Sequence, residues 1–370
     1  MLWIAFAALA VAFVGAFFWL RGRRHGEFDL LAHPHVERFP GAHPSDPSHA
    51  AVSETMQRAA PLLALPMREQ LPALRAFMDE LGMSRASTAQ LIPVDAGDVR
   101  GEWVLAPGAD PSVRTLYIHG GAFTMGSPRS HRPLTEHFSR LTGGAVFAVD
   151  YRLMPEHRRS AGIADCRAAY RWVLDNGPDG PGPCSALVVA GDSAGGNLTL
   201  STIAWARDAR LRRADAAVAL SPLTDASFGS PSMKANVATD TMLGPMFGKL
   251  ARLPKVLLPF VGGIMSQARP SNPDISPLHG DLHDLPPILV QASESEMLHD
   301  DAHRYVAKAV AAGTLARFQT WEHMPHVWQM FDPYLDEANH ALDEIGGFLD
   351  EFLPRRPASA GSAQAAAIPK

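Results

Sequence analysis

The sequence of 370 residues has little cysteine, only Cys166 and Cys184. Two thiols in a chain of this length cannot form a disulfide framework, which excludes the class of small secreted domains held together by disulfides. We expect both cysteines to be small core residues.

The chain also lacks a marked excess of either charge. It has 33 Lys and Arg against 38 Asp and Glu, which gives a formal net charge of −5. A protein that binds nucleic acid usually has a basic face or stripe, and here the densest basic cluster, Arg21, Arg23 and Arg24, adjoins an apolar segment instead. We therefore expect no nucleic-acid partner.

Metal-ligand patterns are equally sparse. His299 and His303 are four residues apart, as are His279 and His283, and this spacing suits a metal on a helix. Neither pair has an evident third ligand. We interpret all four histidines as surface groups and expect neither a metal nor a cofactor.

One long hydrophobic run is present, at residues 1–20, and it contains no charged side chain. A helix of this length would reach roughly 30 Å, the thickness of a bilayer core. Trp3 and Trp19 lie near its ends, and the arginines follow on one side only. The segment predicts a single-pass membrane anchor with the catalytic domain in the cytoplasm, and a cleaved signal peptide is the alternative.

The remaining chain divides into three parts by composition, and no internal repeat is present. Residues 21–50 contain several prolines and histidines and predict a linker. Residues 51–353 predict one globular domain, and residues 354–370 a disordered tail.

Short apolar runs alternate with helical patterns in the globular part. A helical stripe is formed by Leu71, Leu74, Met78 and Leu81. Further along, this order indicates an α/β protein, whose mostly parallel central sheet is flanked by helices. The expected strands are VRTLYIHG (113–120), GAVFAVDY (144–151), SALVVAGD (185–192), AAVALSP (216–222), PPILVQAS (286–293) and LARFQTW (315–321).

The stretch Gly191-Asp192-Ser193-Ala194-Gly195 follows one of these strands. The carboxyl ends of parallel strands face the ligand crevice, and glycines two residues before and after a serine permit the sharp turn known as the nucleophile elbow. We therefore predict that Ser193 is a nucleophile. The alternative interpretation is a tight turn with an incidental serine.

Three motifs in the expected order resemble the hormone-sensitive-lipase-like family of α/β-hydrolases: HGGA at 119–122, DYRLMPEH at 150–157 and GDSAGG at 191–196. The resemblance covers about residues 90–353 and implies an α/β-hydrolase fold with a helical cap, matched here by residues 51–90 and 226–272. The family pattern is usually HGGG, so Ala122 is a departure. Gly120, Gly121, Ala122 and Ala194 are the implied oxyanion-hole residues, and we interpret His119 as structural.

The resemblance also implies an acid and then a histidine after the serine. Glu296 matches the acid position, with Asp300 as the alternative. His326 matches the histidine, with His323 as the weaker alternative.

These residues predict a serine carboxylic-ester hydrolase that forms an acyl-enzyme. The Met- and Phe-rich cap segment and the expected anchor favour lipophilic esters or lactones as substrates. Two alternatives stay open: a catalytically silent ligand-binding homologue, and an amidase or acyltransferase with the same triad.

Overall fold

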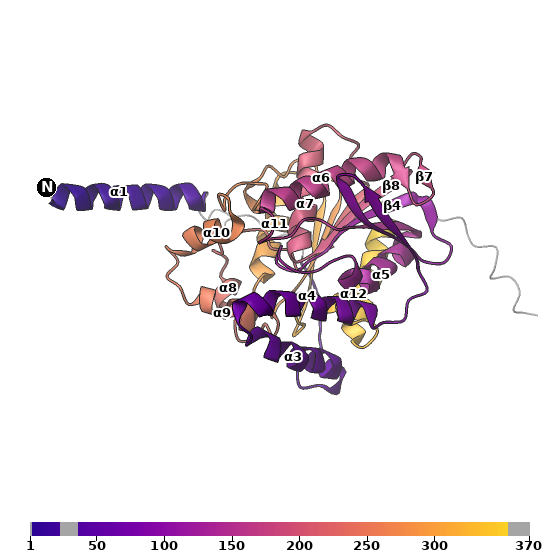
Figure 1. The fold of residues 1–370 in the computed structure, drawn as a ribbon, viewed down its shortest axis with the longest axis horizontal. Coiled ribbons are helices and arrows are strands. Elements are labelled where there is room, and N and C mark those ends of the chain that lie inside the picture. The colour runs from indigo at the N-terminus through magenta and orange to yellow at the C-terminus, as the bar shows by residue number, and fades with distance from the viewer. Residues whose placement is uncertain (1, 23–35, 354–370) are drawn as a thin grey trace, which may run out of the picture.

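The computed structural model describes residues 2–22 and 36–353. The expected tail at 354–370 and the part of the expected linker at 23–35 lie outside these residues. All elements discussed below belong to the described part of the chain (Figure 1).

A nine-stranded sheet forms the centre of the described chain, in the order β1-β11-β10-β9-β8-β4-β5-β3-β2. Six consecutive parallel strands of this sheet, from β11 to β5, are those expected from the sequence. Most of their side chains are buried because helices cover both faces of the sheet. They are β4 (Asp110–Ile118), β5 (Gly144–Val149), β8 (Ala186–Asp192), β9 (Ala216–Leu220), β10 (Ile288–Ser293) and β11 (Ala316–Trp321).

The edges of the sheet differ from the sequence-based expectation. β2 (Gln90–Ala96) and β3 (Val99–Leu105) form an antiparallel hairpin that joins β5. At the other edge β1 (Val36–Phe39) pairs with β11, so the prediction that 21–50 is a linker is wrong for these residues. Phe39 stacks on Trp321 at 4.3 Å between ring centroids, a long-range contact that the local composition could not indicate.

Helices pack on both faces of the sheet. α5 (Arg132–Thr142) and α12 (Asp336–Asp350) cover one face. α6 (Arg159–Asp175), α7 (Ala194–Asp208) and α11 (His299–Ala311) cover the other. Shorter elements are β6 (Asn176–Gly177), β7 (Gly180–Pro181) and the 3-10 helices η1 (Pro47–His49), η2 (Arg129–His131), η3 (Pro277–His279) and η4 (Trp328–Phe331).

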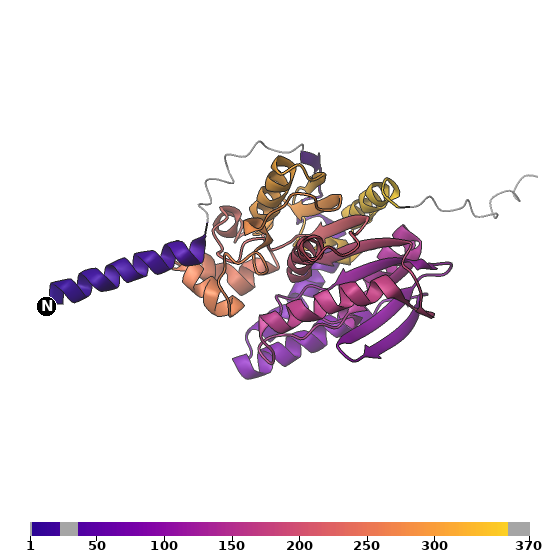
Figure 2. The same cartoon turned by 90° about the horizontal axis from the view of Figure 1, so that it is seen from above.

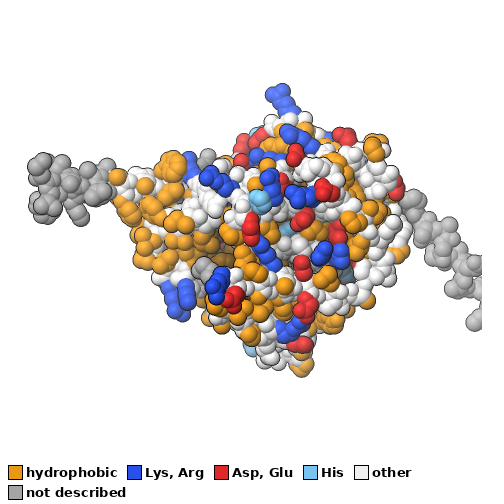
Figure 3. Space-filling view, viewed as in Figure 1, with side chains coloured by type: hydrophobic (Ala, Val, Ile, Leu, Met, Phe, Trp, Pro, Cys, Tyr) orange, Lys and Arg blue, Asp and Glu red, His pale blue; other side chains and the backbone are white. Residues whose placement is uncertain are grey.

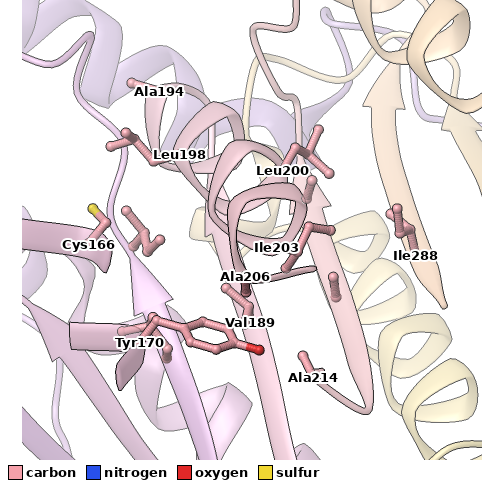
Figure 4. Packing of buried hydrophobic residues seen from close by; sticks show 14 of the residues in the cluster. Cys166, Tyr170, Val189, Ala194, Leu198, Leu200, Ile203, Ala206, Ala214 and Ile288 are labelled. Carbon is pink, nitrogen blue, oxygen red and sulfur yellow. The ribbon is translucent and has the colours of Figure 1, made fainter. Parts of the chain in front are cut away.

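The two cysteines differ in how deeply they lie in the core beside α7. Figure 4 shows Cys166 and Tyr170 of α6 in one cluster with Leu198 and Ile203 of α7 and Val189 of the sheet. Cys166 is fully buried, as expected, whereas Cys184 is half-buried at the margin of this cluster. The expectation of a core residue is therefore confirmed for the first thiol only.

Both segments expected to form the cap contain helices. The first provides α3 (Ala50–Leu63) and α4 (Met67–Met83). The second provides α8 (Ser232–Ala235), α9 (Leu243–Ala251) and α10 (Leu258–Ser266). Figure 1 shows α3 and α4 along one side of the molecule and α8–α10 at the end nearer α1.

The N-terminal segment forms a helix, α1 (Leu2–Arg21), that projects from the body beside α10 in both cartoon views (Figures 1 and 2). Phe13 stacks on Phe260 of α10 at 5.0 Å, and hydrophobic side chains gather at this end of the face in Figure 3. Within the described residues, no helix meets the length and apolarity needed to cross a membrane. The expected transmembrane helix is thus not supported.

Candidate active site

Ser193 lies in the turn between β8 and α7, with φ 53° and ψ −115°. A non-glycine residue seldom adopts a positive φ, and such backbone strain is concentrated at functional sites. The turn also brings chain segments very close together, since a Cβ on Gly195 would lie 1.9 Å from the carbonyl oxygen of Ile118. The two glycines of Gly-x-Ser-x-Gly are therefore required because the turn leaves no room for a side chain at either position.

The structure brings Ser193, His326 and Glu296 together from three distant parts of the chain. His326 Nε2 lies 2.9 Å from Ser193 Oγ, and His326 Nδ1 lies 2.7 Å from Glu296 Oε2. Both the histidine and the glutamate are buried. This is the geometry in which a histidine takes a proton from a serine while a carboxylate orients the imidazole.

The carboxylate of Glu296 is held in place by hydrogen bonds on both of its oxygens. The backbone N–H of Ser293, the last residue of β10, donates to Glu296 Oε1 at 3.1 Å. The other carboxylate oxygen thus remains for His326. One oxygen fixes the side chain to the sheet and the other fixes the histidine.

The electrostatics of the site favour the charged form of His326. Burial by itself would lower the pKa of His326, but the hydrogen bond and charge of Glu296, with the charges of Asp240 and Asp192, raise it above the ordinary value. An imidazolium at this position is consequently stabilised.

The two alternative assignments lie elsewhere. Asp300 accepts a hydrogen bond from the backbone N–H of Ser232 at 2.7 Å and lies 3.3 Å from His299. The exposed His323 contacts the ring of His43 at 5.5 Å. Among the described residues neither is hydrogen-bonded to the Ser193–His326–Glu296 group, so the geometry favours Glu296 and His326.

The loop after β4 carries the expected oxyanion-hole residues. Gly121 and Ala122 have φ values of 110° and 53°, and their N–H groups have no hydrogen-bond partner within residues 2–22 and 36–353. Ala194 is the first residue of α7, so its N–H has no acceptor within the helix. These three donors are available for an oxyanion.

Gly120 differs from these three residues, and its expected role as an oxyanion donor is wrong because its N–H already has an acceptor. Its N–H donates to Asp192 Oδ1 at 3.1 Å. Asp192 also accepts from the hydroxyl of Tyr117 at 2.8 Å and contacts His131 at 3.3 Å. Burial by itself would raise the pKa of Asp192, but the charge and hydrogen bond of His131 and the hydrogen bond from Tyr117 lower it. Gly120 therefore anchors the loop after β4 to Asp192, the residue before Ser193.

His119 supports the same loop, in agreement with its structural interpretation. Its ring stacks on Tyr151 at 4.3 Å, and the Tyr151 hydroxyl donates to the His119 carbonyl at 2.9 Å. Burial, and secondarily the nearby His131, lowers the pKa of His119 to about 3. The imidazole is thus neutral across the ordinary pH range.

Asp240 is a residue near the site that the sequence analysis did not identify. It is buried and lies between α8 and α9, where Oδ2 accepts from the backbone N–H of Met297 at 2.8 Å and Oδ1 accepts from Leu243 at 2.7 Å. Burial raises the pKa of Asp240, whereas the charge of His326 opposes that rise. Asp240 thereby joins the cap to the residue after Glu296. No local motif marks it, because its contacts span 57 residues of sequence.

A cavity of about 1130 Å³ opens above Ser193 and His326. Its walls come from both cap segments and from the loop after β4. Methionine and aromatic side chains are prominent among the lining residues, which include Phe77, Met78, Phe123, Met125, Met233, Met242, Met246, Phe247, Met265, Met297, Met330 and Phe331. Such a site suits an apolar ligand with few directing polar groups.

Arg75 of α4 ties the first cap segment to this region. Its guanidinium donates to the Thr124 carbonyl at 2.7 Å, to the Met154 carbonyl at 3.0 Å and to Glu156 at 2.8 Å. Glu156 thus joins the loop after β5 to α4 of the cap.

The histidine pairs also have clear positions. His279 is buried against Asp225 at 3.3 Å, so its interpretation as a surface group is wrong. His283 is exposed and pairs with Asp281, and His299 and His303 are half-buried. Among the residues that the structure describes, no group of three or more metal-ligating side chains occurs.

Comparison with known proteins supports this description. A family model described as alpha/beta hydrolase fold matches residues 115–330. An acetyl-hydrolase of Streptomyces hygroscopicus is 36% identical over 69% of this chain and 81% of its own length. An esterase of Acinetobacter venetianus is 31% identical over 75% of this chain and 88% of its own length.

Solved structures agree. The crystal structure of an esterase from the bacterial hormone-sensitive lipase family aligns with a TM-score of 0.71 at 32% identity, covering 84% of this chain and 99% of that one. With the matched family model, the relatives and this fold taken together, the chain belongs to the hormone-sensitive-lipase-like family of α/β-hydrolases.

Proposed function

We propose that this carboxylic ester hydrolase acts on lipophilic esters or lactones through an acyl-enzyme formed on Ser193. The observation that carries the proposal is the continuous hydrogen-bonded chain from Ser193 through His326 to Glu296 at the base of an apolar cavity.

The proposed reaction begins when Ser193 Oγ attacks the ester carbonyl carbon. His326 Nε2 accepts the hydroxyl proton, and Glu296 stabilises the imidazolium. The N–H groups of Gly121, Ala122 and Ala194 receive the developing oxyanion. His326 then returns the proton to the leaving alcohol, and water attacks the acyl-enzyme by the same route.

Ser193→Ala tests this assignment. We expect ester turnover to fall on the order of a millionfold, or about 8 kcal/mol, because the triad acts as a unit. Ser45→Ala, a change at an exposed serine, is the matched control and should retain full activity. Retention of ester turnover by Ser193→Ala would remove the basis of the assignment.

Covalent labelling separates this enzyme from a ligand-binding homologue that has lost its chemistry. An activated serine attacks an organophosphonate, whereas an unactivated one does not. We expect stoichiometric labelling at Ser193, seen as a mass increase on the peptide that contains it. An unlabelled protein would favour the binding homologue.

The substrate class is tested with a ladder of esters of increasing acyl length. The apolar cavity supports a rise in kcat/KM with chain length until the cavity is filled. A relative is named acetyl-hydrolase, and a sharp preference for acetyl esters would contradict the lipophilic proposal. Amides and lactones of the same acyl group, tested in parallel, separate hydrolysis of esters from amidase activity, and product analysis reveals acyl transfer.

Membrane placement, with the catalytic domain on the cytoplasmic side, stays a prediction from residues 1–20 and the arginines that follow them.

A further inference from the structure

Arg159, the first residue of α6, is buried without a compensating carboxylate. Its side chain is 4% exposed, and both of its hydrogen bonds come from Nη2, to Asn197 Oδ1 at 2.8 Å and to the Ile275 carbonyl at 3.3 Å. Nε is buried and has no partner among the described residues. The guanidinium also lies 3.4 Å from the ring centroid of Phe123. All these neighbours are neutral.

A second buried arginine shows how the fold satisfies such a group when it has only a structural role. Arg114 is 3% exposed, and its Nε, Nη1 and Nη2 donate to five backbone carbonyls. Arg159 is buried to the same degree but uses one nitrogen of three. Burial lowers the pKa of Arg159 to about 9, which reflects the missing countercharge, since a buried cation is normally paired.

Arg159 lines a second cavity, of about 420 Å³, that is strongly basic. Its lining contains four arginines, Arg158, Arg159, Arg167 and Arg171, and a single carboxylate, Asp274. Asp274 pairs with Arg167, and the Nε of Arg167 is also buried without a partner among the described residues. The lining therefore carries a net positive charge that the described protein does not neutralise.

The same cavity lies at the N-terminus of a long helix. α6 has 17 residues, no acidic residue in its first turn and no side-chain cap. The first N–H groups of a helix and its dipole favour an anion. The terminus of α6 and the guanidinium of Arg159, whose Nε has no partner among the described residues, both favour negative charge.

We infer that this arginine-lined cavity binds a carboxylate or phosphate group, with Arg159 as its central donor. Both groups present paired oxygens that match the fork of a guanidinium. Arg159, Ser266 and Gln267 line this cavity and the ester cavity alike. The anion is thus either free or carried on a substrate whose ester lies at Ser193.

Isothermal titration of the whole protein with inorganic phosphate, at constant ionic strength, tests the inference without turnover. It therefore succeeds or fails independently of the proposed ester hydrolysis. We expect Arg159→Met to weaken phosphate binding by about tenfold or more, because charged hydrogen bonds are lost. Arg171→Gln, an exposed change within the cavity, should weaken it by a smaller factor. Arg213→Gln removes an exposed arginine paired with Asp284 and should leave it unchanged.

If Arg159→Met fails to fold, Arg158→Gln and Arg171→Gln, both at exposed positions, replace it in the titration. Each should lower the affinity for phosphate. Absence of phosphate binding in the native protein, or the same affinity in all variants, would overturn the inference. An affinity lowered equally by Arg213→Gln would also overturn it, because that result indicates general electrostatic attraction.

A pair of esters then identifies the source of the anion. Methyl hexanoate and the monomethyl ester of adipic acid have the same chain length, and only the second has a free carboxylate. A higher kcat/KM for the acid ester, with a preference that is reduced in Arg171→Gln and unchanged in Arg213→Gln, indicates an anionic substrate. Equal values, together with phosphate binding, indicate a free anion in the same cavity.

Discussion

Replacing Glu296 by glutamine tests the arrangement of the site most directly. The substitution keeps the size of the side chain and removes its charge. The Ser293 N–H still needs an acceptor at the position of Oε1, so the amide oxygen will occupy that position. The amide NH2 then faces His326 Nδ1, where Oε2 stands in the native protein. A donor there forces the imidazole proton onto Nε2, which faces Ser193, and the base is lost.

The size of the effect follows from the geometry. An imidazolium and a carboxylate about 4 Å apart attract by about 4 kcal/mol at an effective dielectric constant of 20. That energy corresponds to about a thousandfold in rate. The wrong tautomer adds to this loss, so we expect kcat to fall by about 10³- to 10⁴-fold, with a smaller change in KM.

Steady-state hydrolysis of a chromogenic ester measures the effect, and circular dichroism confirms folding. Glu294→Gln is the matched control, because Glu294 is two residues away, partly exposed and paired with Arg38. It should retain near-native kcat. If Glu296→Gln kept more than about a tenth of the native kcat, a loss below about 1.4 kcal/mol, the assigned role of Glu296 would be wrong.

Three further predictions follow from the same structure. First, kcat/KM should rise with pH through a pKa above the ordinary histidine value of 6.5, because the pKa of His326 is raised and only the neutral imidazole accepts a proton; a pH–rate profile with its inflection below that value would contradict this. Second, Asp192→Ala should lower the free energy of unfolding by about 2–5 kcal/mol, measured by urea denaturation, and reduce kcat, because the Gly120 N–H loses its acceptor; an unchanged kcat would show that the loop needs no such anchor. Third, Gly195→Ala should destabilise the protein by about 3 kcal/mol or more because its Cβ meets a carbonyl oxygen. The same change at Gly347, where nothing lies within 4 Å, should be neutral or stabilising by up to about 1 kcal/mol in a thermal melt.

The sequence predicted the parts of the fold that local patterns determine. The parallel strands were identified because both of their faces are buried, which leaves uninterrupted apolar runs such as Ala186–Asp192. The hairpin of β2 and β3 and the edge strand β1 were missed. β1 and β2 lie at the edges of the sheet and have no fully buried residue, so they lack the uninterrupted apolar run of an inner strand. β1 in addition pairs with residues far along the chain, such as Trp321.

The candidate site divides in the same way. Ser193 was identified because the backbone turn restricts its neighbours to glycine, and Glu296 and His326 because they match a family motif. Asp240 and Arg159 were missed, since their importance comes from burial and from partners far along the chain. The Gly120 N–H was assigned wrongly because only the three-dimensional structure places Asp192 within its reach.

The hydrogen bond from the Met297 N–H to Asp240 has a consequence for engineering. Asp240 belongs to the second cap segment, whereas the residue it holds adjoins Glu296. A chimera that exchanged this segment for one from another esterase would change the walls around the acyl chain and also remove a support behind the acid. Such a chimera would acquire the new substrate specificity with a lower kcat, unless the donor segment supplied an equivalent carboxylate.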